Sequence, residues 1–175
     1  MEYTLKRSRR AKYMRLRVLP GGAVVLTAPQ WSSLGAIERF VRTHASWLSR
    51  AIAHMSHFKA LPVSGRRAYL KHKEEARAYI AERVEYWNRE YGFAYGRIAI
   101  KNTRRLWGSC SRKGNLNFSY ALLFLPRELA DYVIVHELCH LKEHDHGVRF
   151  WENVARVLPD YRALKRELRR YLPAG

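Results

Sequence analysis

Two histidines four residues apart, with a glutamate directly after the first, set the strongest limit on what this chain can fold into. They are His136 and His140, in the segment His136-Glu137-Leu138-Cys139-His140. On an α-helix, residues i and i+4 lie about 40° apart around the axis, so both imidazoles can reach one ion while Glu137 lies beside them. The preceding residues, 129–135, are mostly apolar, which predicts that the motif lies on a core helix.

The residues after this motif offer a third metal ligand. His146 follows the second histidine by six residues, a spacing found in zincins whose third ligand is histidine. We expect the helix to end just before Gly147, where a turn would let the chain reverse toward the ion. His146 is therefore the predicted ligand and His144 the alternative, with Glu143 and Glu152 as possible competitors.

These residue types suit metal-assisted hydrolysis. Neutral imidazoles bind Zn²⁺ well, and three protein ligands leave a fourth position for water, whose pKa then falls from about 16 to about 7. Glu137 is well placed to take the proton from that water and pass it to a leaving group. We therefore predict a zinc site with Glu137 as general base, although three histidines also accept Mn²⁺, Co²⁺ or Ni²⁺.

The chain is strongly basic. It has 33 Lys and Arg against 15 Asp and Glu, a formal net charge of +18. Residues 1–60 are the more densely basic part, with 11 basic and 2 acidic side chains. Such a positive field attracts polyanions, so nucleic acid or a nucleotide is a candidate partner.

The cysteines and the hydropathy indicate the compartment in which we expect the protein. Two cysteines, Cys110 and Cys139, give no disulfide framework. No apolar run approaches the roughly 20 residues that span a bilayer, and residues 1–10 lack the apolar core of a signal peptide. We therefore expect a cytoplasmic protein with reduced thiols and no membrane partner.

Residues 1–60 predict a basic N-terminal unit of strands and a helix. Two strand-like segments, 13–18 and 23–27, flank a turn at 19–22, which predicts a β-hairpin or small meander. Ser32 and Ser33 then offer N-caps to one helix that ends near residues 54–57. The following Leu-Pro-Val-Ser-Gly segment, residues 61–65, is the predicted connector.

Residues 61–175 predict an α+β catalytic domain. We expect the following elements: a helix from Arg66 to about Tyr91, strands at 97–101, 106–111 and 116–119, a helix opened by Pro126, and two closing helices on either side of Pro159. The strands should form a small antiparallel sheet packed on the HExxH helix, which is a zincin-like core. An edge strand beside that helix could pair with an extended peptide.

Three segments carry a resemblance to a known family. They are RSRRAKYMRLRV, TRRLWGSCSRKGNLNFSYAL and LPRELADYVIVHELCHLKEHDHGVRFW, which lie between Arg7 and Trp151. On these residues the chain resembles the YgjP-like family of small zincin-type metal-dependent hydrolases, which is similar to the SprT-like metallopeptidases. The combination of WGSCS, HELCH and HGVRFW is more specific than HELCH alone.

The resemblance implies roles for residues of the site. It implies zinc ligands at His136, His140 and His146, with Glu137 as catalytic acid/base. It also places the WGSCS segment, residues 107–111, on a strand close to the active-site cleft.

Two further groups of residues are given roles from the sequence without the family resemblance. We expect Phe150 and Trp151 to pack the closing helix onto the site and to hold the third ligand. Candidate donors to an oxyanion are Arg104, Arg105 and Tyr161.

Three functions compete. The leading interpretation is a zinc-dependent peptidase that acts on extended peptides or unfolded protein. An alternative is hydrolysis of a nucleotide phosphoanhydride, as in a nucleoside triphosphate pyrophosphatase; the absence of a Walker-type glycine loop counts against it. The third is a nucleic-acid-associated protease module whose basic hairpin binds phosphates through Arg7, Arg9, Arg10, Lys12, Arg15 and Arg17.

Overall fold

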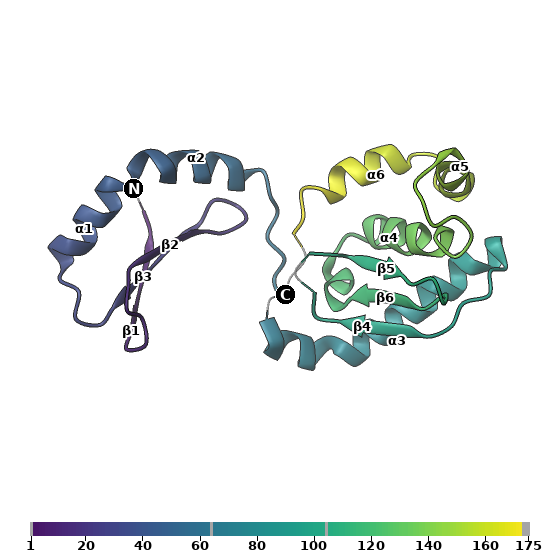
Figure 1. Ribbon diagram of the computed structural model, residues 1–175, viewed down its shortest axis with the longest axis horizontal. Coiled ribbons are helices and arrows are strands. Elements are labelled where there is room, and N and C mark those ends of the chain that lie inside the picture. The colour runs from purple at the N-terminus through teal and green to yellow at the C-terminus, as the bar shows by residue number, and fades with distance from the viewer. Residues whose placement is uncertain (1, 64, 104, 173–175) are drawn as a thin grey trace. The chain divides into compact units, whose positions relative to one another are not determined.

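The computed structural model describes residues 2–63, 65–103 and 105–172 (Figure 1). The chain forms two compact units, Met1–Ala60 and Leu61–Gly175. None of the helices in the described part of the chain has the length and apolar character needed to cross a membrane.

The first unit contains a three-stranded sheet with β3 in the centre. Its strands are β1 (Thr4–Ser8), β2 (Arg15–Val18) and β3 (Val24–Pro29), in the order β1-β3-β2. The predicted hairpin is present, since β2 and β3 are antiparallel and both glycines of the turn have positive φ. The first strand pairs with β3 in parallel, so the sheet is not a simple meander.

The single helix predicted after Ser33 is wrong, because the chain forms two helices. They are α1 (Leu34–Thr43), capped by the Ser33 side chain, and α2 (Ala45–Ser56). His44 separates them: its backbone leaves the helical region, and its ring Nδ1 donates to the Phe40 carbonyl at 2.8 Å. A side chain that bonds the backbone of the preceding turn competes with helix continuation, and apolar periodicity does not reveal this.

The second unit is an α+β domain built around one buried helix. Its elements are α3 (Gly65–Tyr91), β4 (Ile98–Lys101), β5 (Gly108–Cys110), β6 (Leu116–Ser119), the short 3₁₀ helix η1 (Tyr120–Phe124), α4 (Arg127–Cys139), α5 (Val148–Val157) and α6 (Tyr161–Leu168). The central helix α4 contacts α3, β5, α5 and α6 (Figure 1). Most of its residues are buried, and the buried set includes the charged residues Asp131 and Glu137 as well as the apolar ones.

The sheet of this unit is mixed, which corrects the predicted antiparallel sheet. Its strand order is β4-β6-β5, with β5 antiparallel and β4 parallel to β6. The hairpin turn at Lys113-Gly114 joins β5 to β6, with Gly114 at φ 71°. β4 precedes β5 in the chain but lies on the other side of β6, and because β4 and β6 both run opposite to β5, they are parallel to each other. Alternation in the sequence indicates strands but not their neighbours.

The HExxH helix ends earlier than predicted. Its last residue is Cys139 and His140 is its C-cap, whereas Gly147, expected to follow the helix, is the N-cap of α5. Beyond α4 the backbone tightens, because Leu141 N–H donates to the Leu138 carbonyl at 3.0 Å. The chain therefore reverses directly after the second histidine of the motif.

Candidate metal centre

Three histidines converge where α4 ends. His136 lies in the last turn of α4, His140 caps it, and His146 lies in the loop that precedes α5. One nitrogen from each ring lies within 4.8 Å of the others, and Nε2 of His136 is 3.1 Å from Nε2 of His146. The alternative ligands His144, Glu143 and Glu152 do not belong to this group.

The early end of α4 shapes this arrangement. His140 Nδ1 donates to the backbone carbonyl of Glu143 at 3.0 Å, which fixes the ring and leaves Nε2 for an ion. His136 Nδ1 is buried and has no hydrogen-bond partner among the residues that the structure describes, and its Nε2 is the nitrogen next to His146. The two helix histidines therefore present Nε2 to the cluster.

Aromatic side chains pack around the histidines. The buried Phe150 ring lies 4.6–4.8 Å from all three imidazoles, measured between ring centroids. Trp151 stacks on His146, with centroids 5.7 Å apart and planes at 26°, and Tyr161 stacks on Trp151 at 5.0 Å. His146 is exposed and outside a helix, so this stack limits the orientations of its ring.

Burial keeps the helix imidazoles neutral. Burial, reinforced by the other two histidines and by Lys165, lowers the pKa of His136 to about 3. Burial also lowers the pKa of His140. Neutral imidazole is the form that binds a metal, and three converging imidazole nitrogens are a ligand set that fits a divalent ion.

Glu137 lies on a different side of α4 from the histidines. Its side chain is buried against β5, and burial raises the pKa of its carboxyl to about 8, against the opposing effect of a hydrogen bond from the Cys110 backbone N–H. It does not belong to the histidine group. This position suits a group that exchanges protons beside a metal more than it suits a ligand.

The approach of β5 to Glu137 requires a glycine. A Cβ on Gly108 would lie 2.6 Å from Cγ of Glu137 and 2.8 Å from its Oε1, both too close for a side chain that is itself buried. Gly108 is the first residue of β5 and belongs to the WGSCS segment. The segment thus brings the β5 backbone against the Glu137 carboxyl. From the sequence alone, Gly108 could mark either a β-bulge or such a close approach.

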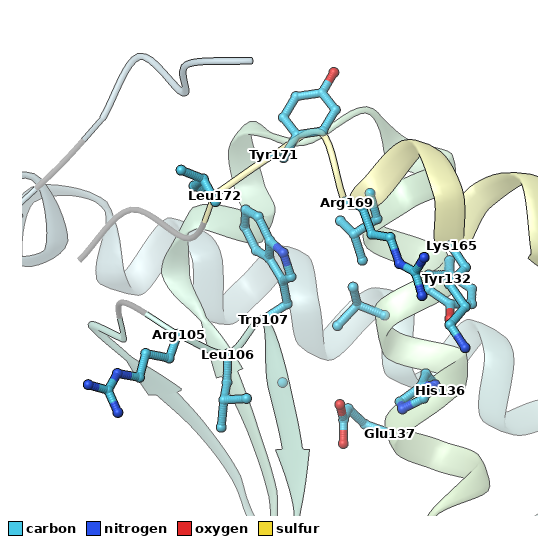
Figure 2. Close-up of a pocket in the computed structure, with 13 residues that line it drawn as sticks. Arg105, Leu106, Trp107, Tyr132, His136, Glu137, Lys165, Arg169, Tyr171 and Leu172 are labelled. Carbon is cyan, nitrogen blue, oxygen red and sulfur yellow. The ribbon is translucent and has the colours of Figure 1, made fainter. Parts of the chain in front are cut away.

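A cavity of about 460 Å³ lies beside Glu137 and His136. Figure 2 shows Leu106 and Trp107 on one side and Lys165 and Arg169 on the other. Four of its basic and aromatic residues were not singled out from the sequence: Tyr132, Tyr171, Lys165 and Arg169. The sequence signal for the last two is their i, i+4 spacing on one face of a helix, but spacing does not say what that face meets.

The three candidate oxyanion donors differ in their positions relative to this cavity. Arg105 lines this cavity, whereas Tyr161 does not line it and lies in the aromatic stack instead. Arg104 lies outside the described residues.

The fold and the histidine group together describe an α+β domain with a place for a divalent metal. The family model of the YgjP-like metallopeptidase domain matches residues 64–171, more than half of the chain. The chain therefore belongs to the YgjP-like metallopeptidase family, and at the level of that family it is a metal-dependent peptidase.

Two further comparisons complete this result. No curated protein matches the chain. The chain is similar to the crystal structure of the metallopeptidase zymogen of Pyrococcus abyssi abylysin, with 24% identity and a TM-score of 0.47 over 52% of this chain and 93% of that one.

Proposed function

We propose that this protein is a zinc-dependent endopeptidase. Its ligands are His136, His140 and His146, and Glu137 is the general base. The proposed catalytic domain is residues 61–175. Its substrates are extended peptides or unfolded protein. The observation that carries the proposal is the convergence of three imidazole nitrogens within 4.8 Å beside the buried Glu137 carboxyl group, in a chain of a metallopeptidase family.

In this proposal the chain positions the reacting groups and transfers the proton. When bound, zinc supplies a Lewis acid that lowers the pKa of its water. Glu137 takes the proton and delivers it to the leaving amine, and the hydrogen bond from Cys110 N–H together with the contact with Gly108 holds its carboxyl in place. Because β5 is an edge strand of the sheet, its backbone can pair with an extended peptide next to Glu137.

The test compares wild type with Glu137→Gln on an unfolded protein and on a panel of nucleoside triphosphates, with Zn²⁺ added. Glutamine keeps the shape but not the proton exchange, so we expect bound metal to persist and protein cleavage to fall about 10²- to 10⁴-fold. Glu128→Gln is the matched control, since Glu128 lies exposed in the first turn of the same helix. A Glu137→Gln rate near wild type would remove the general base from the proposal.

The same experiment separates the competing substrate class. Triphosphate hydrolysis that depends on Glu137, without protein cleavage, would keep the metal chemistry and replace the peptide by a nucleotide. Cleavage of protein alone supports the peptidase.

We also propose that the first unit binds a polyanion such as nucleic acid. Four side chains of the hairpin region, Arg10, Lys12, Arg15 and Arg17, line one hollow of about 470 Å³. The other two arginines named from the sequence have structural bonds instead. Arg7 donates to the carbonyls of Gln30 and Ser32, and Arg9 donates to Gln30 Oε1. Four cations around one hollow can contact successive phosphates.

A further inference from the structure

We propose that the cavity beside Glu137 is a specificity subsite that binds a carboxylate of the peptide substrate. The inference rests on the proposed peptidase function and names its preferred substrates, which carry an acidic group close to the scissile bond. The cavity is defined here as the carboxylate subsite.

The subsite adjoins the proposed reaction centre. His136 and Glu137 form one end of its lining, and the rest comes from the segment before β5, from α4 and from α6 with the residues after it. In Figure 2, Arg105 lies on one side, while Lys165 and Arg169 lie on the other, above His136 and Glu137. A substrate residue held here is therefore next to the bond that Glu137 would help to cleave.

The charge of the lining is one-sided. The lining holds three cations, Arg105, Lys165 and Arg169, and a single carboxyl, that of Glu137. Lys165 and Arg169 lie above His136 and Glu137, whereas the guanidinium of Arg105 points away from them (Figure 2). Among the described residues none of the three cations forms an ion pair; Lys165 instead lies over the Trp151 ring, with Nζ 4.2 Å from its centroid. Unpaired cations around a concave, partly apolar surface concentrate their field on the space between them, which favours an anion.

The size and the apolar walls indicate an amino-acid residue and not a bare anion. The volume of about 460 Å³ lies within the range of small-molecule sites. Five apolar side chains contribute to the lining: Leu106, Trp107, Val133, Leu168 and Leu172. Such a surface accepts a hydrocarbon stem while the cations bind its carboxylate. Two groups have this chemistry: an Asp or Glu side chain and the α-carboxylate of a peptide C-terminus.

The experiment uses one peptide in six forms. The residue next to the cleaved bond is Glu, Gln or Lys, each with a free or an amidated C-terminus, and mass spectrometry locates the cleavage. The enzymes are zinc-loaded wild type, Arg169→Glu and the control Arg166→Glu. Arg166 lies on the same helix but does not line the subsite, so its variant reproduces the change in net charge alone.

For wild type we expect kcat/KM to be at least about tenfold lower for a peptide that lacks the carboxylate bound by the subsite, because charge-assisted hydrogen bonds are lost. Loss on changing Glu to Gln identifies the side chain, and loss on amidation identifies the C-terminus. Arg169→Glu should abolish the preference and improve cleavage of the Lys peptide, whereas Arg166→Glu should keep the wild-type order.

Binding supplies a readout that does not need turnover. The same peptides are titrated into zinc-loaded Glu137→Gln protein by calorimetry, where acidic forms should bind at least about tenfold tighter and Arg169→Glu added to this variant should remove the difference.

Two outcomes would overturn the subsite and leave the peptidase standing: equal cleavage of all six peptides, or an unchanged preference in Arg169→Glu. If wild type cleaves no peptide, the peptidase proposal fails on its own evidence. Binding of a nucleoside triphosphate that Arg169→Glu abolishes, with no peptide bound, would then assign the cavity to nucleotides and overturn the carboxylate subsite as well.

Discussion

At the scale of single residues, the position of Glu137 depends on the absence of a side chain at Gly108. Gly108→Ala would place a Cβ 2.6 Å from Cγ of Glu137, and the buried carboxyl would have to move. Displacement of a catalytic group by about 1 Å can cost on the order of 100-fold in rate. We therefore expect kcat to fall about 10- to 100-fold with metal content unchanged, as measured by turnover and metal analysis of the same preparation.

Gly35→Ala is the matched control for this prediction. Gly35 lies in α1, and a Cβ there would meet no atom within 4 Å. It should leave turnover unchanged. If Gly108→Ala retained full activity, the close packing of β5 against Glu137 would have no part in catalysis.

At the scale of secondary-structure elements, a buried ion pair joins α3 to α4. Arg83 donates to both carboxylate oxygens of Asp131, at 2.7 and 2.8 Å, and the side chains are 4% and 8% exposed. Removal of one partner leaves the other charge buried, which costs about 3–5 kcal/mol. We expect Arg83→Leu to lower the free energy of unfolding by that amount, as measured by denaturant titration.

Two variants test whether burial is the cause. Arg77→Leu removes an exposed pair with Glu74 on the same helix and should cost less than about 1 kcal/mol. The double variant Arg83→Leu with Asp131→Leu should recover part of the stability, because no unpaired charge remains. A double variant as unstable as the single one would show that the loss comes from packing.

The elements of the second unit follow closely from local sequence, but their pairing does not. The sequence predicts the second sheet's strands within two residues at each end, because turn residues and apolar runs act locally. The parallel pairing of β4 with β6 depends on contacts between distant segments. The end of α4 also escapes prediction, since the bond from His140 to the Glu143 carbonyl ends the helix without a glycine or proline.

The candidate site also has a part that the sequence predicts and a part that it does not. The i, i+4 spacing predicts that His136 and His140 lie together, because this geometry is a property of any helix. His146 is predicted from its interval of six residues after His140, and the structure brings its ring to the other two. Lys165 and Arg169 could not be assigned, since basic residues on an amphipathic helix ordinarily face solvent. Only the packing of α6 against α4 turns them toward the cavity.

At the scale of the whole molecule, the basic character of the first unit is a separate property from the metal site. We expect binding of duplex DNA to weaken with salt, and substitution of Arg10, Lys12, Arg15 and Arg17 by glutamine to reduce the slope of log K against log salt by about 3 to 4. Peptide turnover should not change. Fluorescence anisotropy over a salt series measures the slope.

The control for this prediction removes four exposed charges from α3 instead, by substitution of Arg66, Arg67, Lys71 and Arg89. It should change the slope little. An equal loss in both variants would indicate attraction by net charge, without a defined phosphate-binding surface.

The identity and ligands of the bound metal test the central claim most directly. X-ray absorption at the zinc edge, on protein with its zinc content determined, reports the ligand atoms and their distances. We predict one zinc per chain with three imidazole nitrogens at about 2.0–2.1 Å, and loss of stoichiometric zinc in His146→Ala. Sulfur at about 2.3 Å, or full zinc binding in His146→Ala, would contradict the three-histidine centre.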